Sequence, residues 1–403
     1  MNPVTKPFRA LLSWLVGSAM LAILLPLVLL HRWRRSPSDA GKPRLFWGTT
    51  PIVSMPMNAR ALRAAGYESR AVALANPGFA IPDAFDHVIR ETASPHFWRR
   101  RGMGTLRALG CFARSLREYD IYHFFFTGGL LRKTPLRLVE PWLLRLARKK
   151  VIVFPYGSDA FAPSRIPYPK WREVLLADYP RLAREDRAIA RRLDRFCRDA
   201  DLVVGSLVHC VTLPRWDALM LTCYPVDTER LRPAYPDGAD GRMRILHAPN
   251  HRAIKGTRAL LEVVDKLRAE GLPIELEVME RRPHGEIIAA MRKADLVVDQ
   301  LHFGYGLTAM EAMALGKMVI SGANPPEHDR LFHDLGLKEC PVIWSNPEDI
   351  ETRLRDLCAH PEKWEAIGRA GRAYVEKYHS CAATAENWIA LYERLGYQRL
   401  PNT

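Results

Sequence analysis

Two segments in the second half of the chain carry the residue types that bind phosphate groups. In the first, HAPNHRAIKGT (247–257), a strand-like apolar run is followed by Arg252, Lys255 and Gly256, and then by an amphipathic stretch. Lys255 and Gly256 are therefore expected at the start of a helix, where free backbone N–H groups and the macrodipole attract phosphate. The alternative is a solvated loop with ordinary surface cations, because short motifs of this kind recur by chance.

The second segment, HFGYGLTAMEAMALGK (302–317), has the features of a nucleotide-binding turn. Gly304 and Gly306, on either side of Tyr305, allow a backbone to approach a ligand closely, and the helix expected after them points its N-terminus at the same place. Glu311 lies one turn into that helix among Ala and Met residues. A carboxylate in this position is either a surface group or an acceptor for two sugar hydroxyls.

Further polar residues follow strand-like runs in the first half of the chain. YGSDAF follows VIVF and offers Gly157 and Asp159 at a turn, and GTTPI offers Gly48 and Thr49 after the first expected strand. Ligands of open parallel sheets bind at the carboxyl ends of the strands, so these four residues are candidates for an acceptor cleft. His123 is a weaker candidate, since a histidine within IYHFFF is more typical of strand packing than of a catalytic base.

No metal site is expected. Asp199-Ala200-Asp201 is formally the DxD motif that holds a metal–diphosphate complex in one class of sugar-transferring enzymes. It straddles the end of a helix and the start of a strand, however, and ADLVV recurs at 294–298 without a second DxD, so we interpret it as structural. Neither GxxxxGK[ST] nor HExxH occurs in the sequence.

The expected elements form two similar halves. Short apolar or β-branched runs alternate with amphipathic stretches on both sides of a break rich in Pro, Gly and Asp at 232–241. This alternation predicts an α/β fold with two Rossmann-like parallel-sheet domains that face a cleft, one over 44–231 and one over 242–378. The remaining residues, 379–403, are expected to form a carboxy-terminal helix capped by Ser380.

Residues 10–30, ALLSWLVGSAMLAILLPLVLL, form an uncharged apolar run near the amino terminus. Its 21 positions would make about 31 Å of helix, which matches a bilayer core of roughly 30 Å. The alternatives are a cleaved signal peptide and a buried core helix, but the run is long for a signal peptide and has no small-residue cleavage site at its end. We interpret it as one transmembrane anchor, after a short tail (1–9) and before a linker (31–43).

The charge distribution favours anionic partners. The chain has 59 Lys and Arg against 44 Asp and Glu, a formal net charge of +15. Residues 98–150 hold thirteen Lys and Arg against three acidic residues, with Leu136, Val139, Leu143 and Leu146 at helical spacing among them. This pattern predicts either a core-packing helix with a solvated basic face or a face that binds an anionic membrane surface. No pattern typical of nucleic-acid binding accompanies the charge, so nucleic acid is not expected as a partner.

Two further features indicate the cytoplasmic side of a cell membrane. Basic residues are more numerous after the apolar run than before it, and the positive-inside rule then places the large part of the chain in the cytoplasm. The seven cysteines are odd in number and contain no CxxC, which fits a reducing compartment.

The two phosphate-binding candidates lie within a longer pattern that resembles a known family. Residues 244–322, from HAPNHRAIKGT through KADLVVDQLHFGYGLTAMEAMALGK to MVISG, resemble the donor domain of the family 4 retaining glycosyltransferases of the GT-B fold, and 44–206 resemble it more loosely. The resemblance implies a nucleotide-sugar substrate between the domains, with no metal or other cofactor. It also implies that Lys255 contacts the donor diphosphate, that 304–306 present backbone N–H groups to it, and that Glu311 holds the nucleotide ribose.

Two positions depart from the family pattern. Phe303 stands where the first of the family's paired glutamates would lie, eight positions before Glu311, and Asp299 is the candidate to replace that carboxylate. Asn250 stands in place of the usual arginine, so Arg252 is its candidate replacement.

The expected function is a membrane-anchored glycosyltransferase that moves a sugar from a UDP- or GDP-sugar to a lipid-linked or cell-envelope polysaccharide acceptor, with retention. The alternative is a non-catalytic, membrane-tethered binding protein for nucleotide sugars or glycans on the same scaffold. A GT-B epimerase or phosphorylase would fit the anchor less well.

Overall fold

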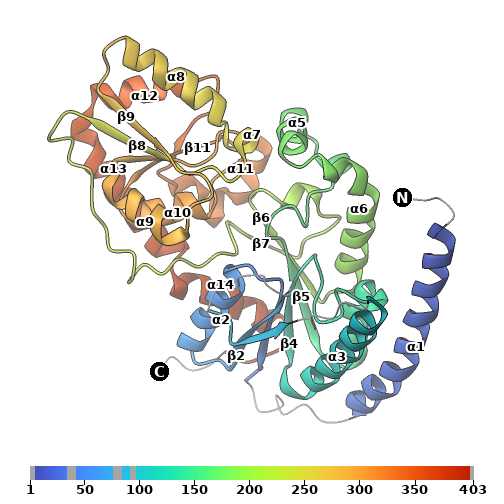
Figure 1. The fold of residues 1–403 in the computed structure, drawn as a ribbon. Helices are drawn as coiled ribbons and strands as arrows, with labels where there is room; N and C mark the ends of the chain where they lie inside the picture. The colour runs from blue at the N-terminus through green and yellow to red at the C-terminus, as the bar shows by residue number, and fades with distance from the viewer. Residues whose placement is uncertain (1–4, 34–41, 76–83, 91–96, 400–403) are drawn as a thin grey trace.

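The computed structural model describes residues 5–33, 42–75, 84–90 and 97–399, which form two α/β domains with parallel sheets (Figure 1). The first sheet has the order β3-β2-β1-β4-β5-β6-β7 and the second the order β12-β11-β10-β8-β9. The strands of the first are β1 (Leu45–Thr49), β2 (Ser69–Ala75), β3 (His87–Arg90), β4 (Ile121–Phe125), β5 (Lys150–Phe154), β6 (Leu202–Ser206) and β7 (Ala218–Met220). Those of the second are β8 (Met243–His247), β9 (Ile274–Val278), β10 (Leu296–Val298), β11 (Met318–Ser321) and β12 (Ile343–Trp344).

Helices cover both faces of each sheet, as parallel sheets require. One face of the first sheet packs against α3 (Phe97–Glu118), α4 (Glu140–Leu146) and α6 (Arg181–Asp199), and α5 (Pro169–Asp178) precedes α6. Its other face packs against α2 (Ser54–Ala64) and α14 (Cys381–Arg394). One face of the second sheet packs against α8 (Thr257–Ala269) and α12 (Ile350–Ala359). The other face packs against α9 (His284–Lys293), α10 (Leu307–Ala314) and α13 (Trp364–Tyr378). Helix α11 (Pro326–Phe332) follows β11.

The last helix returns to the first domain. Ser380 caps α14 by accepting a hydrogen bond from Ala383 N at 3.2 Å, as the sequence predicts. Trp388 of this helix donates to Asn58 Oδ1 of α2 at 2.8 Å. The carboxy-terminal helix therefore completes the core of the first domain, and Figure 1 shows it beside α2.

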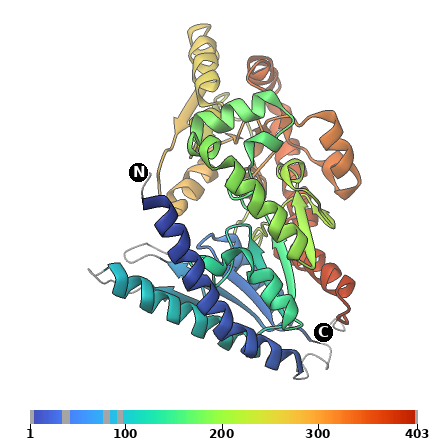
Figure 2. The same ribbon diagram turned by 90° about the vertical axis from the view of Figure 1, so that its right-hand side faces the viewer.

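The apolar amino-terminal run forms α1 (Thr5–Trp33), which lies along the outside of the first domain beside α3 (Figure 2). Among the described residues, Leu11–Arg32 is the one helix long and apolar enough to cross a membrane, by length and composition alone. Met20, Leu24 and Val28 are buried against the domain, whereas the side of α1 that carries Leu15 and Ile23 is exposed and apolar. One side of α1 is therefore free to contact lipid while the other contacts protein.

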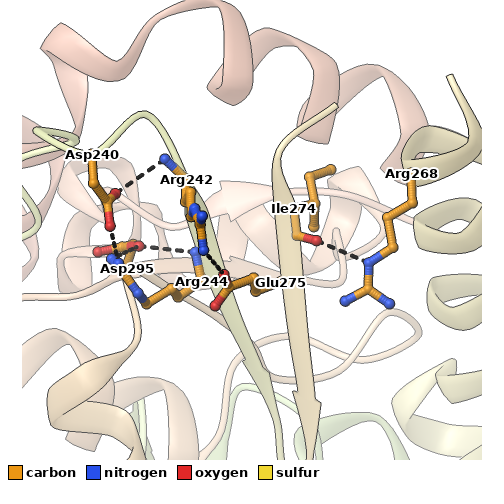
Figure 3. Close-up of polar contacts among 7 residues, drawn as sticks. All are labelled: Asp240, Arg242, Arg244, Arg268, Ile274, Glu275 and Asp295. Carbon is orange, nitrogen blue, oxygen red and sulfur yellow. Dashed lines mark hydrogen bonds and ion pairs between the residues drawn. The ribbon is translucent and has the colours of Figure 1, made fainter. Parts of the chain in front are cut away.

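The two ADLVV segments have the same structural role. Asp201 precedes β6 and accepts a hydrogen bond from Val151 N of the neighbouring strand at 2.9 Å. Asp295 precedes β10 and likewise accepts one from Arg244 N at 2.9 Å. Figure 3 shows Asp295 with Arg244 at this edge of the second sheet. Each aspartate satisfies a backbone donor at the start of a strand, which supports the structural interpretation of the DxD sequence.

Two expected elements differ from the structure. The helix expected over 135–148 is divided into a 3₁₀ turn, η2 (Pro135–Leu138), and α4, because Pro141 begins a new helix more readily than it continues an old one. The basic face expected on this helix is also partly used inside the protein. Lys149 is buried against Asp120 at 3.2 Å, and Arg145 contacts Asp201 at 3.5 Å.

Candidate functional site

Lys255 lies near the carboxyl ends of the second sheet, directly before Gly256, which is the N-cap residue of α8 as the sequence predicts. Lys255 ends the short helix α7 (Arg252–Lys255), and Gly256 separates α7 from α8 with a left-handed φ of 67°. A Cβ atom at Gly256 would also lie 2.8 Å from Leu301 Cβ, so this position requires glycine for two reasons. The turn holds the Lys255 side chain, which is 8% exposed, against the loop after β10.

Asp299 is the centre of the site. Its Oδ1 pairs with Lys255 Nζ, and its Oδ2 accepts a hydrogen bond from Gly306 N at 2.9 Å. Both charged side chains are buried, so each compensates for the loss of water around the other. The expectation that Gly306 presents a free N–H group to a phosphate is therefore wrong for this conformation, because Asp299 accepts that hydrogen.

Glu311 lies in α10 with its carboxylate largely buried, and His284 is its partner. His284 is the first residue of α9, and its Nε2 lies 2.8 Å from Glu311 Oε1. The hydrogen bond to Glu311 raises the pKa of His284 above its ordinary value. Sequence reasoning missed His284, although its place after a proline at a helix start was a usable signal.

Two predicted donor-site side chains point elsewhere. Arg252 is 63% exposed and pairs with Glu280 at 2.6 Å. Tyr305 is buried inside the second domain, where its hydroxyl lies 3.0 Å from Tyr374 Oη and 2.9 Å from His379 Nε2. Tyr305 thus anchors the glycine loop to α13 and does not face a cleft. Gly304 is buried in the loop, where its carbonyl accepts a hydrogen bond from the Gln300 amide and a Cβ atom would lie 2.7 Å from Asn324 Oδ1.

The predicted acceptor residues of the first domain build its loops. Thr49 is fully buried and donates to Gly129 O at 2.7 Å. Gly48 leaves no room for a side chain, because a Cβ atom there would lie 2.8 Å from the Phe46 ring. Thr49 therefore supports the loop after β4, and Gly48 allows close packing within the sheet.

Asp159 organises the next loop, after β5. Its carboxylate accepts hydrogen bonds from Gly157 N at 2.9 Å and from Tyr156 N and Phe126 N at 3.1 Å. Burial raises the pKa of Asp159 to about 7, against the lowering effect of these backbone donors. Gly157 is half-buried at this turn, and a Cβ atom there would meet open space, whereas Asp159 is buried.

His123 is a core residue, and its prediction as a cleft residue is wrong. Its ring stacks on Trp47 with centroids 3.7 Å apart, Nδ1 lies 3.1 Å from Phe46 O, and Nε2 lies 2.9 Å from Tyr392 Oη. Burial lowers the pKa of His123 to about 3. The packed-strand alternative is therefore correct.

The two domains meet beside the Lys255 turn. Asp178 at the end of α5 accepts a hydrogen bond from Ile254 N of α7 at 2.8 Å. Phe303, at the position of the absent glutamate, packs across this interface on Trp171 of α5 with ring centroids 4.7 Å apart. An aromatic contact between the domains thus occupies the place where a carboxylate is common in the family that the sequence resembles.

The described residues contain no group of three or more His, Cys, Asp or Glu side chains that could hold a metal ion. Asp199 pairs instead with Arg195 at 2.6 Å and with Arg198 at 3.1 Å. The DxD aspartates are thus engaged within the first domain.

Residues 243–390 match a family model described as glycosyl transferase-like. This region is therefore similar to a glycosyltransferase-like domain. The whole chain has the GT-B fold, as its similarity to solved structures shows. HepE from Anabaena, solved with UDP-glucose, has a TM-score of 0.55 at 13% identity, over 88% of this chain and 99% of that one. A glycosyltransferase from Rickettsia africae has a TM-score of 0.51 at 12% identity, over 88% and 98% of the two chains. No curated protein sequence matches the chain.

The glycosyltransferase-like domain contains Lys255, Asp299, the glycine loop and Glu311, so the buried polar site belongs to the part of the chain that the family model covers.

Proposed function

We propose that the chain is a nucleotide-sugar-dependent glycosyltransferase that uses a UDP- or GDP-sugar and retains the configuration at the transferred sugar. The main support is the buried Lys255–Asp299 pair beside the glycine loop, with Glu311 one helical turn beyond. A buried cation near a strand's carboxyl end suits the diphosphate of a donor, and a buried carboxylate suits ribose hydroxyls.

In this proposal the protein acts mainly on the leaving group. Negative charge grows on the diphosphate as the bond to the sugar breaks, and the Lys255 ammonium stabilises that charge. Asp299 holds Lys255 in place before the donor binds, and Gly306 N holds Asp299. Glu311 orients the nucleotide, so that the sugar lies between the two domains. We assign no general base.

A nucleotide-sugar screen tests this function. The melting temperature of the full chain should rise with one class of nucleotide sugar, because a ligand that binds only the folded state stabilises it. Release of the sugar from that donor, or its transfer, then shows catalysis. The second candidate function, a binding protein without turnover, is favoured by Phe303 in place of a carboxylate; it predicts the rise in melting temperature without any release.

We propose further that α1 anchors the enzyme in the cell membrane, with the large part of the chain in the cytoplasm, where it acts on a lipid-linked or cell-envelope polysaccharide acceptor. The exposed apolar side of α1 supports this, as does the excess of basic residues after it. Leu138 of η2 and Trp142 of α4 are exposed. Both elements contact α1, so these two side chains extend the same apolar surface. Cleavage of the large domain by protease added outside intact cells would contradict the orientation.

Metal removal is expected to leave transfer intact. Lys255 supplies positive charge to the phosphates, and Asp199 is engaged by two arginines rather than aimed at a ligand. EDTA should therefore not abolish transfer, and Asp199→Ala should alter stability at most. Transfer assays with and without the chelator check this. Activity that is lost in EDTA and restored by Mn²⁺ or Mg²⁺ would show that the metal-independent mechanism is wrong.

Nucleotide affinity is expected to increase as the pH rises through the raised pKa of His284. Below that pKa, protonated His284 pairs with Glu311 and stabilises the free protein, and this contribution is lost as the pH rises. Ribose hydroxyls compete with His284 for Glu311, so the affinity for UDP or GDP should improve about fivefold, the difference between a charged and a neutral hydrogen bond. Calorimetric titrations over a pH series measure this.

His284→Ala is the matched variant, since it removes the competitor and keeps Glu311. Its nucleotide affinity should vary little with pH and exceed that of the wild type at low pH. If the nucleotide affinity of this variant changes with pH as that of the wild type does, His284 does not compete with the ribose for Glu311.

A further inference from the structure

Three arginines converge at the carboxyl end of the first sheet. Arg132 follows β4, Arg137 lies in η2, and Arg192 lies in α6. A Cβ atom at Gly128 would lie 3.1 Å from Arg132 Cβ and 3.3 Å from Arg137 Cγ, so both side chains leave the same loop together. Arg192 reaches this loop from the other side, because its Nη2 donates to Asp159 O at 2.9 Å.

The hydrogen bonding of these arginines is incomplete. A guanidinium has five N–H donors. Within the described part of the chain, the side chain of Arg137 makes no hydrogen bond or ion pair, and the buried Nε atoms of Arg137 and Arg192 have no acceptor. Arg132 is held by Leu74 O and Thr50 Oγ1. Arg137 and Arg192 are about half-buried, so each has an inner Nε donor that lacks an acceptor, and a buried unpaired donor is unfavourable.

The nearby carboxyl groups do not neutralise the arginines. Asp159 and Glu140 are both committed to backbone N–H groups, and burial raises the pKa of each to about 7. Burial, together with the charges of Arg192 and Arg132, lowers the pKa of Arg137 to about 10. The cluster thus has an excess of positive charge that an anionic ligand would balance.

The position of the cluster identifies the source of that anion. It lies at the carboxyl ends of β4 and β5, the edge at which open parallel sheets bind ligands. It also adjoins α1, because a Cβ atom at Gly17 would lie 3.2 Å from Pro135 Cβ, two residues before Arg137. A phosphate at this place would sit next to the helix assigned to the membrane.

We propose that Arg137 and Arg192, with Arg132 beside them, bind the phosphate or diphosphate group of a lipid-borne sugar acceptor. The planar forks of arginine match phosphate oxygens in pairs, and the adjoining apolar surface of α1 suits the lipid chain. This inference rests on the proposed transferase function and adds to it the chemical class of the acceptor. Arg137 was expected on an exposed basic face, and its inward position gives it this different role.

The test uses the full chain in detergent micelles, with its donor site saturated by UDP. Farnesyl diphosphate is the probe, and farnesol is the uncharged control. Arg137→Gln and Arg192→Gln should each weaken farnesyl diphosphate binding about tenfold, the effect of losing one charge-assisted contact. Arg114→Gln, which changes an exposed arginine of α3, should leave it unchanged. Wild-type affinity in both cluster variants would overturn the proposal.

Two further measurements separate the possible outcomes. UDP binding by each variant shows that it is folded, and Arg137→Lys provides a milder change if Arg137→Gln does not fold. If the cluster variants lose binding to phosphatidylglycerol vesicles but keep farnesyl diphosphate, the arginines bind bulk lipid and the acceptor proposal is wrong. If the wild type binds UDP but not farnesyl diphosphate, this inference is wrong and the proposed function stands. If the wild type binds neither UDP nor farnesyl diphosphate, the proposed function is wrong as well.

Discussion

Lys255→Ala is expected to lower transfer by a factor of ten to a hundred and also to destabilise the fold. A charge-assisted hydrogen bond to the donor diphosphate contributes about 1.5 to 3 kcal/mol, which sets the loss of transfer. The loss of stability has a separate cause. Asp299 is almost completely buried, and without Lys255 its charge has no counter-ion and keeps only the hydrogen bond from Gly306 N, which costs about 3 to 5 kcal/mol. Denaturant unfolding and transfer assays below the KM for donor measure the two effects.

A double variant separates these effects. In Lys255→Met with Asp299→Asn, the uncharged amide can still accept the hydrogen bond from Gly306 N, so most of the stability should return. Transfer should not return, because the cation remains absent. Glu311→Ala, which removes the proposed ribose contact, should show a comparable loss of transfer. Wild-type transfer in Lys255→Ala would remove this residue from the donor site.

Leu15→Asp combined with Ile23→Asp is expected to release the protein from the membrane. Both side chains are about half exposed on the outer side of α1, at 51% and 54%, and contact no core of the protein. A charged residue at the centre of a membrane helix costs roughly 2.5 to 3.5 kcal/mol, a cost that applies to Ile23 near the middle of the span, and Leu15 nearer its end adds a smaller cost. Fractionation of cells, followed by flotation of the protein with vesicles, measures the shift.

Leu331→Asp is the matched control, because this leucine of α11 is 43% exposed but lies on the second domain. The Leu331→Asp variant should remain in the membrane fraction, as the wild type does. Salt should weaken only the part of vesicle binding that depends on anionic lipid, since ions screen that attraction. A double variant that remains in the membrane fraction would contradict the role of α1 as the anchor.

The sequence predicts most of the elements because their periodicity is local. Strands buried on both faces are apolar throughout, as VIVF and LVV are, and helices between them show one apolar side. β3 (HVIR) escaped notice because it is short and lies at the edge of the sheet, where polar residues are tolerated. Proline disfavours the interior of a helix, so Pro141 indicated a break. The leucines around it recur at helical spacing, however, and this pattern predicted one continuous helix.

Side-chain direction could not be predicted in the same way, because it depends on partners far along the chain. Tyr305 turns inward to reach Tyr374 and His379, and His123 is enclosed by Trp388 and Tyr392 of α14. None of these pairings has a signal in the short motifs. The residue types of the candidate donor site were recognisable, whereas the contacts of Asp299 and His284 and the inward position of Arg137 required the fold.

The central claim is that the Lys255 site binds the diphosphate of a nucleotide sugar, and calorimetric titration of the full chain with UDP and GDP tests it most directly. We predict saturable binding of one nucleotide per chain, weakened about tenfold or more by Lys255→Ala with Asp299→Asn and unchanged by Asp199→Ala. The claim would be contradicted if the double variant bound the nucleotide as strongly as the wild type, or if the wild type bound neither UDP nor GDP.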